Sequence, residues 1–334
     1  MKIFKALGAA IVVAFGLGQA HAQDKTELEI GYMPILPVSQ LFVAIEEGWL
    51  DDAGIDADLV QFQNGPAMVQ ALLAGQLDVA YFGIGPAMVA RARGADIKVV
   101  ASNIIEQISV VTLGDLTPYF DGDHATAFAR FAADNGRKPV ITTFPTGSVP
   151  ETVTQYWLRK QLGIDPDDVE LIYQGAAQVQ QALLTGAVDG AVILEPIVSS
   201  VVARVDGAAI VASGSELFPN QPGAVLVVRE GAIAAHPEAV SALVKAHVEA
   251  TEILREDAPR ATPSVAKYVG GGRMDSAIVR AAIDRSKNGF VADPNQIVAG
   301  TQVMHDFQAE LGTLKQPVDL DALFDLTIYD SLAK

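Results

Sequence analysis

Two segments of this chain, residues 63–80 and 174–191, are copies of one element. The first reads QNGPAMVQALLAGQLDVA and the second QGAAQVQQALLTGAVDGA, at an offset of 111 residues. Eight of the eighteen paired positions are identical: Gln63/Gln174, Gln70/Gln181, Ala71/Ala182, Leu72/Leu183, Leu73/Leu184, Gly75/Gly186, Asp78/Asp189 and Ala80/Ala191. This offset exceeds the roughly 20–50 residues of a solenoid repeat and is close to the length of one domain. The repeat therefore predicts two similar lobes with a cleft between them.

The repeat and its surroundings divide the 334 residues into four ranges. We expect a signal peptide at 1–22, the first part of lobe 1 at 23–112, lobe 2 at 113–222, and a return to lobe 1 with C-terminal helices at 223–334. Two extended apolar runs, 108–113 and 224–228, are interpreted as the crossings between the lobes.

Predicted strands and helices alternate in both lobes, which indicates an α/β fold with parallel strands and helices on the sheet faces. Ser39 is expected to cap the first helix, and Ser148 and Glu151 have the spacing of a capping box. Strands are predicted at 27–33, 57–62, 77–82, 98–102, 139–144, 169–173 and 188–194, and helices at 39–48, 66–75, 124–135, 177–185, 237–255, 276–285 and 294–311.

Loops rich in Gly, Pro, Ser and Thr follow the predicted strands. Ligands of parallel α/β sheets bind beyond the carboxyl ends of the strands. These loops lack Arg and Lys, so an anion there would be held by hydroxyls and by the N–H groups of helix N-termini. Ordinary strand-to-helix turns are the alternative interpretation. The candidate ligand-binding residues in the loops are Met33, Pro34, Ile35, Leu36, Gln63, Asn64, Gly65, Gly83, Ile84, Gly85, Pro86, Thr146, Gly147, Ser148, Val149 and Gln174.

Three further candidates, Glu106, Phe144 and Glu195, lie at or just beyond the ends of predicted strands. Either carboxylate could pair with an amine, a ring N–H or a cation, and either could instead cap a helix or face solvent. Phe144 could stack on a ligand, although an aromatic residue within a buried strand is more often part of the core.

Motifs typical of enzymes are missing from the sequence. It contains no GxSxG, P-loop, HExxH or GxGxxG pattern, its five histidines are scattered, and it has no cysteine. We therefore predict no enzyme activity, no catalytic residue, no metal site and no cofactor. The net charge of −17 argues against nucleic acid as a partner, because phosphate binding requires clustered Lys and Arg.

The N-terminus has the pattern of a secretory signal peptide. Lys2 and Lys5 precede an apolar run at 6–18, and a small-x-small site ends at Ala22. The apolar run is shorter than the about 20 residues that span a membrane. We expect cleavage after Ala22 and, because no cysteine follows to carry a lipid, a periplasmic protein without a lipid anchor.

Several stretches in order resemble the periplasmic solute-binding proteins of ABC importers, in the nitrate/sulfonate/taurine group, with the thiamine-precursor binders as relatives. They are IGYMP, EEGWL, QFQNGPAMVQALLAGQLDVAYFGIGPA, PTGSVPETV, LLTGAVDGAVILEP, AAHPEAVSALVKAHVEAT and LFDLTIYDSL, and together they cover nearly all of 27–332.

The resemblance implies a type II periplasmic binding protein fold, whose two similar lobes are joined by two hinge crossings and close on a ligand. It implies a receptor, expected to be a monomer, that delivers a small-molecule ligand to an ABC transporter inner-membrane permease. The chain departs from the family where Leu194 precedes Glu195-Pro196 instead of an aromatic residue, and where 117–139 replaces a short linker.

The implied ligand is a small organic anion such as a sulfonate, taurine or nitrate. A neutral or cationic heterocycle such as a thiamine-pyrimidine precursor is the alternative, with Glu106 or Glu195 on a ring nitrogen. An enzyme on the same fold, such as a pyrimidine-precursor synthase, is a third possibility, against which the secretion signal and the missing nucleophiles argue.

Overall fold

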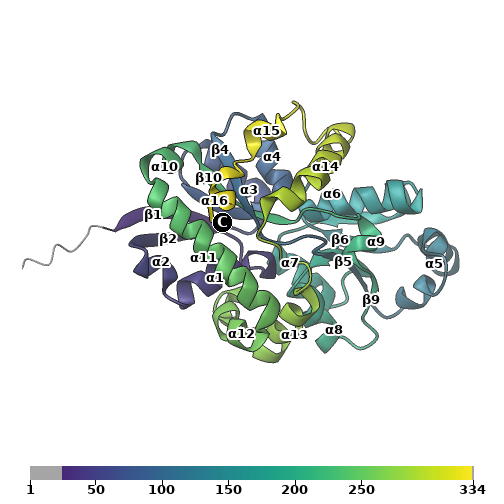
Figure 1. The fold of residues 1–334 in the computed structure, drawn as a ribbon. Coiled ribbons are helices and arrows are strands. Elements are labelled where there is room, and N and C mark those ends of the chain that lie inside the picture. The colour runs from purple at the N-terminus through teal and green to yellow at the C-terminus, as the bar shows by residue number, and fades with distance from the viewer. Residues whose placement is uncertain (1–24, 333–334) are drawn as a thin grey trace, which may run out of the picture.

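Two five-stranded sheets organise the chain in the computed structural model, which describes residues 25–332 (Figure 1). The predicted signal peptide lies outside the described residues. The sheet of lobe 1 has the order β2-β1-β3-β10-β4, and that of lobe 2 the order β7-β6-β8-β5-β9. The strands are β1 (Thr26–Tyr32), β2 (Ile55–Gln61), β3 (Val79–Gly83), β4 (Ile97–Ser102), β5 (Ile108–Thr112), β6 (Val140–Thr143), β7 (Glu170–Tyr173), β8 (Gly190–Leu194), β9 (Ala209–Ala212) and β10 (Ala224–Arg229).

The two sheets have the same topology. β1 pairs in parallel with β2 and β3, and β6 pairs in parallel with β7 and β8. Each sheet also contains one antiparallel strand, β10 between β3 and β4 in lobe 1, and β5 between β8 and β9 in lobe 2. The chain crosses between the sheets twice, in the connections from β4 to β5 and from β9 to β10. The runs 108–113 and 224–228, interpreted above as the crossings, instead form the antiparallel strands β5 and β10 that each crossing leads into. The predicted α/β class with parallel strands is therefore confirmed.

Helices cover both faces of each sheet (Figure 1). Lobe 1 contains α1 (Ser39–Glu46), α2 (Trp49–Asp52), α3 (Gly65–Leu73) and α4 (Ile84–Ala92). Lobe 2 contains α5 (Ala127–Asn135), α6 (Val149–Tyr156), a π-helical segment (Trp157–Leu162), α7 (Ala176–Leu184), α8 (Ile197–Arg204) and α9 (Gly214–Leu217). The C-terminal part contains α10 (Glu230–Ala235), α11 (Pro237–Glu256), α12 (Ala258–Ala266), α13 (Ser276–Ser286), α14 (Val298–Glu310), α15 (Leu320–Leu323) and α16 (Thr327–Leu332).

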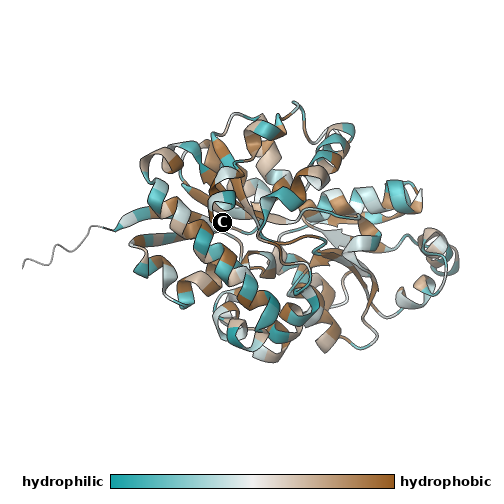
Figure 2. Cartoon of the chain, in the orientation of Figure 1, coloured by the Kyte–Doolittle hydropathy of each residue, from teal (hydrophilic) through white to brown (hydrophobic). Residues whose placement is uncertain are grey.

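Hydropathy explains the layering, because the strands are mostly hydrophobic and the outer helices carry hydrophobic residues mainly on the side that faces a sheet (Figure 2). The predicted helix at 124–135 follows this rule. It forms as a 3₁₀ turn and α5, and Phe128 and Phe131 are buried.

Two helix caps differ from the predicted ones. The Ser39 hydroxyl caps nothing, since a 3₁₀ turn at Leu36–Val38 runs directly into α1 and fixes the backbone there. Ser148 caps α6 by accepting the Glu151 N–H at 3.3 Å, but the Glu151 carboxylate accepts the N–H of Gly147 instead of Ser148. The capping box is thus half formed, because the Ser148 N–H already donates to the carbonyl of Pro145.

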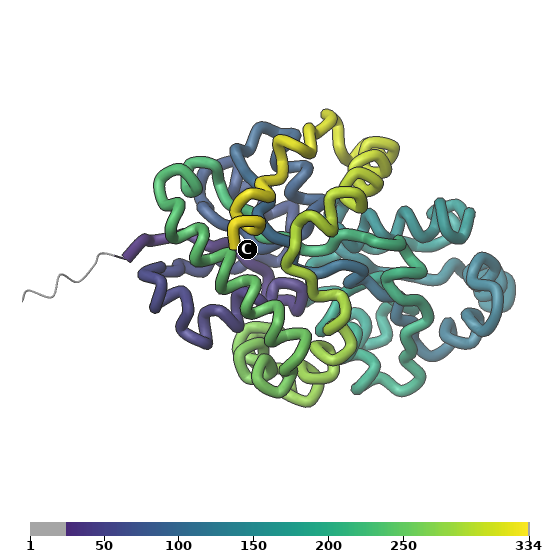
Figure 3. The backbone as a smooth tube through the Cα atoms, in the orientation of Figure 1, coloured from purple at the N-terminus to yellow at the C-terminus, as the bar shows by residue number. Residues whose placement is uncertain are grey.

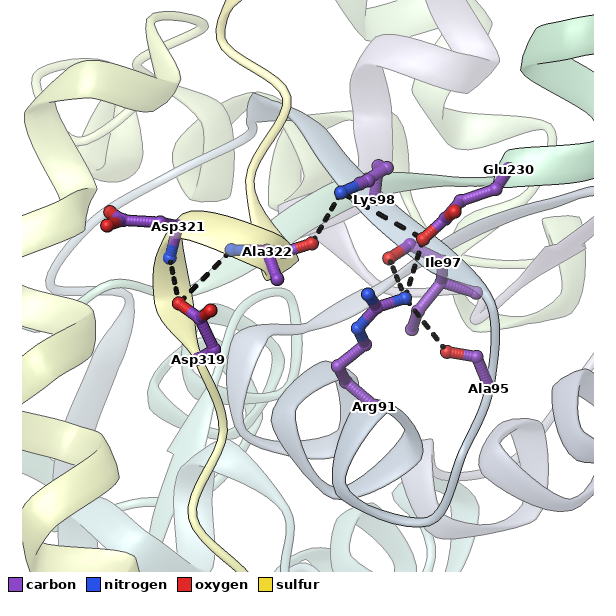
Figure 4. A network of polar contacts seen from close by, with 8 residues as sticks. All are labelled: Arg91, Ala95, Ile97, Lys98, Glu230, Asp319, Asp321 and Ala322. Atoms are coloured by element: carbon purple, nitrogen blue, oxygen red, sulfur yellow. Dashed lines mark hydrogen bonds and ion pairs between the residues drawn. The ribbon is translucent and has the colours of Figure 1, made fainter.

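A polar network attaches the C-terminal segment to lobe 1 (Figure 4). Lys98 on β4 donates to the carbonyl of Ala322 on α15 at 2.6 Å and lies 3.9 Å from Glu230. Glu230 also accepts a hydrogen bond from Arg91 at 2.6 Å, and Asp319 caps α15. The last helices therefore pack on the β4 side of the lobe 1 sheet.

Two C-terminal helices also reach lobe 2 (Figures 1 and 3). α13 packs against α8, and α14 packs against both α4 and α6. Gln308 on α14 donates to the hydroxyl of Thr152 at 2.9 Å, and Lys160 pairs with Glu310 at 2.8 Å. The C-terminal segment thus touches both lobes, beside the two crossings.

Candidate functional site

The carboxyl ends of the parallel strands of the two lobes are in direct contact. We call this contact surface the seam. The backbone N–H of Leu36 in lobe 1 donates to the carbonyl of Glu195 in lobe 2 at 3.2 Å. A Cβ added at Gly175 would lie 3.7 Å from Gln63, so these loops also touch. The lobes are therefore closed on each other.

Glycine makes the closest approach across the seam possible. A Cβ at Gly83 would lie 2.7 Å from Cγ2 of Val149, and one at Gly85 would lie 2.7 Å from Nε2 of Gln308 and 3.5 Å from the carbonyl of Gly147. Because Val149 belongs to lobe 2, a side chain at Gly83 would press on it and favour separation of the lobes, whereas a side chain at Gly85 would displace the flexible end of Gln308. The bare backbone that follows β3 is thus used for lobe contact.

Three cavities lie along the seam, and each is lined by some of the predicted residues. The glutamine cavity has a volume of about 330 Å³ and is lined by Pro34, Ile35, Gln63 and, from α7, Gln180 and Gln181. The threonine cavity of about 320 Å³ is lined by Pro86, Thr146 and Gly147. The hinge cavity, also of about 320 Å³, is lined by Glu106 and Glu195.

The described lining of the glutamine cavity carries one positive charge. Of the described residues that line it, Arg273 is the single charged one. Its side chain makes no ion pair or hydrogen bond within residues 25–332. Ala176 and Ala177, the first residues of α7, also line the cavity, so unpaired N–H groups and the positive end of the helix dipole lie near it.

The threonine cavity, like the glutamine cavity, is lined by residues of both lobes. Lobe 2 contributes the Thr146–Gly147 loop, and lobe 1 contributes α3 and α4, including Arg93. The loop after α14, with Thr313 and Lys315, forms the remaining wall. Both cations are exposed, so the cavity is open to solvent.

The two predicted carboxylates meet in the hinge cavity. Glu195 is buried, and its oxygens accept hydrogen bonds from the Ser199 N–H and hydroxyl, both at 2.8 Å. The same carboxylate forms an ion pair with Arg285, whose Nε lies 3.0 Å from Oε1. Burial raises the pKa of Glu195, although the bonds from Ser199 and Arg285 oppose that shift. Glu106 accepts the N–H of Asn220 at 2.8 Å.

The remaining predicted residues are buried in the seam or act in local structure. Asn64 caps α3 by accepting the Ala67 N–H at 2.9 Å, and Gln174 accepts from the Thr142 hydroxyl at 3.2 Å. The buried ones are Met33, Leu36, Gly65, Ile84, Phe144, Ser148 and Val149, with Gly83 and Gly85 in the contacts described above. Phe144 is only 2% exposed and offers no open face for stacking.

Sequence patterns missed the cations of all three cavities. Arg273 follows Gly270-Gly271-Gly272, which all have left-handed φ angles and belong to the short segment Val269–Gly272. Arg93, Lys315 and Arg285 belong to helix ends or loops far from the predicted strand ends. Nothing local to these four residues indicates that they line the seam, since tertiary contacts bring them there.

Within residues 25–332, no group of three or more His, Asp or Glu side chains is arranged to hold a metal ion. None of the helices in this part of the chain is long and apolar enough to cross a membrane.

Comparison with known protein families now adds to this geometry. The NMT1-like family matches residues 21–270, which include both copies of the repeat and both crossings. This chain belongs to the NMT1-like family. A relative from Brucella abortus (strain 2308), named as a binding protein, is 27% identical over 96% of this chain and 96% of its own length.

Solved structures share the two-lobed fold of this NMT1-like protein. The periplasmic nitrate-binding protein NrtA from Synechocystis PCC 6803 superposes with a TM-score of 0.78 at 16% identity, over 93% of this chain and 89% of that one. The periplasmic aliphatic sulphonate binding protein SsuA from Escherichia coli gives a TM-score of 0.72 at 19% identity, over 90% and 92%. The predicted resemblance and the periplasmic binding protein fold are therefore confirmed.

Proposed function

We propose that this protein is a periplasmic solute receptor that binds a small organic anion between its lobes and delivers it to an ABC transporter permease. The observation that carries the proposal is the seam, where the carboxyl ends of parallel strands from both lobes meet around cavities. Ligands of α/β proteins bind at this edge of a sheet. The names of the relatives, which are binding proteins, support the receptor class.

The glutamine cavity supports an anion as the ligand. Among residues 25–332, its lining combines Arg273, which has no partner there, with amide groups and the N-terminus of α7, and it includes no carboxylate. A sulfonate or nitrate carries several acceptor oxygens and no donor, so it matches a wall of N–H groups. The heterocycle alternative is less well matched to the glutamine cavity, because neither Glu106 nor Glu195 lines it and Phe144 is enclosed in the core.

Closure of the lobes would couple binding to transport. The two crossings would allow the lobes to separate, which would open the seam and expose the cavities to solute. A ligand that contacts both lobes would then shift the population towards the closed arrangement, which the permease would recognise. The predicted domain ranges, periplasmic location and monomeric state belong to this same proposal.

A thermal-shift screen with purified protein tests the ligand class. We expect ethanesulfonate or nitrate to raise the melting temperature, because a ligand that binds only the native state stabilises it. Arg273→Gln should weaken that binding about tenfold or more, whereas Arg255→Gln, an exposed arginine at the end of α11, should leave it unchanged.

Two results would contradict the proposal in different ways. Stabilisation by a thiamine-pyrimidine precursor but by no sulfonate or nitrate would show that the ligand class is wrong. Conversion of a bound compound into product by the purified protein would show that the protein is an enzyme.

A further inference from the structure

The hinge cavity is lined by parts of both crossings and by the end of α13. Its wall includes the first crossing at residues 104–107, the Ser213–Ser215 segment at the start of the second crossing, and residues 285–289 at the end of α13. Glu195 in lobe 2 also lines the cavity. The anion site in the glutamine cavity uses none of these residues.

Glu106 is held in a fixed orientation at this cavity. Glu106 and Asn220 are the two non-glycine residues with positive φ within residues 25–332, at +50° and +57°, and they are bonded to each other. Backbone strain of this kind persists only where surrounding contacts enforce it. Here, Glu106 Oε1 accepts the Asn220 N–H, and the Glu106 N–H donates to the carbonyl of Gln221 at 2.8 Å.

One oxygen of the Glu106 carboxylate stays available. Asn220 is the single donor to this carboxylate among the described residues, and it binds Oε1. Oε2 lacks a hydrogen-bond partner in the same part of the chain. A carboxylate oxygen with no partner, at the wall of a cavity, can accept from an ammonium group.

Arg285 supplies the opposite charge on the same cavity. Its Nε lies 3.0 Å from Glu195 Oε1 in an ion pair, which holds the guanidinium beside a buried carboxylate. Within residues 25–332 the two Nη groups have no acceptor, and the Arg285 side chain is 44% exposed. A guanidinium held in this way presents two parallel N–H groups to an incoming carboxylate or sulfonate.

We propose that the hinge cavity binds a small zwitterion, with its ammonium group on Glu106 and its carboxylate or sulfonate on Arg285. The cavity volume of about 320 Å³ suits a compound of amino-acid size. The hydroxyls of Ser213, Ser215 and Ser286 and the amide of Asn288 provide further polar contacts.

Binding at this site also favours the closed arrangement of the lobes. A ligand held between the first crossing, the Ser213–Ser215 segment and α13 stabilises the geometry in which those segments are together. The coupling rests on the proposed receptor function, whereas binding of the zwitterion does not.

Three probes of similar size test the charge requirement by titration calorimetry: β-alanine carries both charges, propionate only the acid, and propylamine only the amine. The expected result is that β-alanine binds and that each singly charged probe binds at least about tenfold more weakly. Equal binding of β-alanine and propionate would overturn the proposal, and so would the absence of β-alanine binding.

Two variants test whether the zwitterion binds in the hinge cavity. Glu106→Gln keeps an oxygen to accept the Asn220 N–H but removes the charge, and it should weaken β-alanine binding about tenfold or more. Glu27→Gln, an exposed acid on β1, is the matched control. Ser215→Leu, at an exposed position of α9, should fill the cavity and abolish binding even if Glu106→Gln folds poorly.

The outcomes separate this proposal from the receptor proposal. β-Alanine binding that is lost in Ser215→Leu but kept in Arg273→Gln supports the hinge site, whether or not any sulfonate binds. β-Alanine binding that is lost in Arg273→Gln and kept in Ser215→Leu would place the zwitterion in the glutamine cavity and overturn the hinge site.

Discussion

The two copies of the repeat share their secondary structure and differ at the carboxyl ends of their strands, β3 and β8. The bounds of α3 and α7 are 111 residues apart, and so are those of β3 and β8. Asp78 and Asp189 both accept a backbone N–H from the neighbouring strand, from Glu29 and Val140, which are again 111 apart. The identical aspartates therefore make the same link from the start of β3 or β8 to the neighbouring strand.

At and beyond the ends of the matched strands, the two copies differ in sequence and in contacts. β3 ends at Gly83, and the missing side chain leaves room for Val149 of the other lobe. β8 is followed by Glu195, whose carboxylate turns to Ser199 and Arg285 in the hinge cavity. The end of β3 thus contacts the other lobe, and the end of β8 lines the hinge cavity. Neither strand end places a carboxylate on the described lining of the glutamine cavity.

The largest expected effect comes from a group in lobe 1 that makes the free energy of unfolding sensitive to acid. His247, buried in lobe 1, bonds to the carbonyl of Ser102 at 2.7 Å, and burial lowers its pKa to about 4. The unfolded chain takes up this proton below about pH 6.5, so the free energy of unfolding should fall by about 3 kcal/mol as the pH drops to about 4. Urea unfolding across this range measures the loss.

His247→Gln provides the comparison, because it cannot titrate and its amide can still donate to Ser102. The variant should show a flatter pH dependence than the wild-type protein. An identical slope in both proteins would show that His247 does not control the acid response.

The next effect tests the lobe contact at Gly83. Gly83→Ala should destabilise the closed arrangement by about 2 kcal/mol, since the new Cβ would lie 2.7 Å from Val149. Small-angle scattering should then give a larger radius of gyration. Val149→Ala in the same chain should reverse the change, and Gly231→Ala, where nothing lies within 4 Å, should cause none. Failure of the rescue would mean that Val149 is not the obstacle.

The third effect compares the matched aspartates. Burial raises the pKa of Asp189, but bonds from Arg137 and the Val140 N–H outweigh it, so the pKa lies below its usual value. Its stabilisation is therefore present at neutral pH and is lost as the pH falls through that lowered pKa. Asp189→Asn should cost about 1.5 kcal/mol of unfolding free energy at pH 7.

Asp78→Asn is the matched variant and should cost less, about 0.5 kcal/mol, because Arg229 lies 3.9 Å from Asp78 and makes no close ion pair. Urea titration at neutral pH measures both. A larger loss for Asp78→Asn would reverse the expected order of the two copies.

The smallest effect tests how alike the scaffolds are. Gly75 and Gly186 end the matched helices with φ of +70° and +67°. Gly75→Ala and Gly186→Ala should each cost about 1 kcal/mol, since an L-residue is strained in this conformation. Thermal unfolding of the two variants should give equal losses of unfolding free energy. A twofold difference would show that tertiary contacts stabilise the two turns to different extents.

Much of the secondary structure follows from local sequence. Asn64 with Pro66 begins α3, and Gly75 ends it, as their types predict. The Ser39 cap failed because the preceding 3₁₀ turn already sets the backbone. The Ser148–Glu151 pair formed only half a capping box because the Ser148 N–H donates to the carbonyl of Pro145, and the Glu151 carboxylate accepts from Gly147 instead.

The sequence by itself determined the two-lobed α/β architecture, because hydrophobic periodicity, helix ends and an internal repeat are all local or self-similar features. Only the tertiary structure decided how the strand ends are used. Arg273 and Arg285 come from C-terminal segments that reach the seam through packing, and Glu195 is turned towards Arg285 by that packing. Charge and shape at the seam thus depend on residues about 80 to 240 positions apart in the chain, and such contacts have no local sequence pattern.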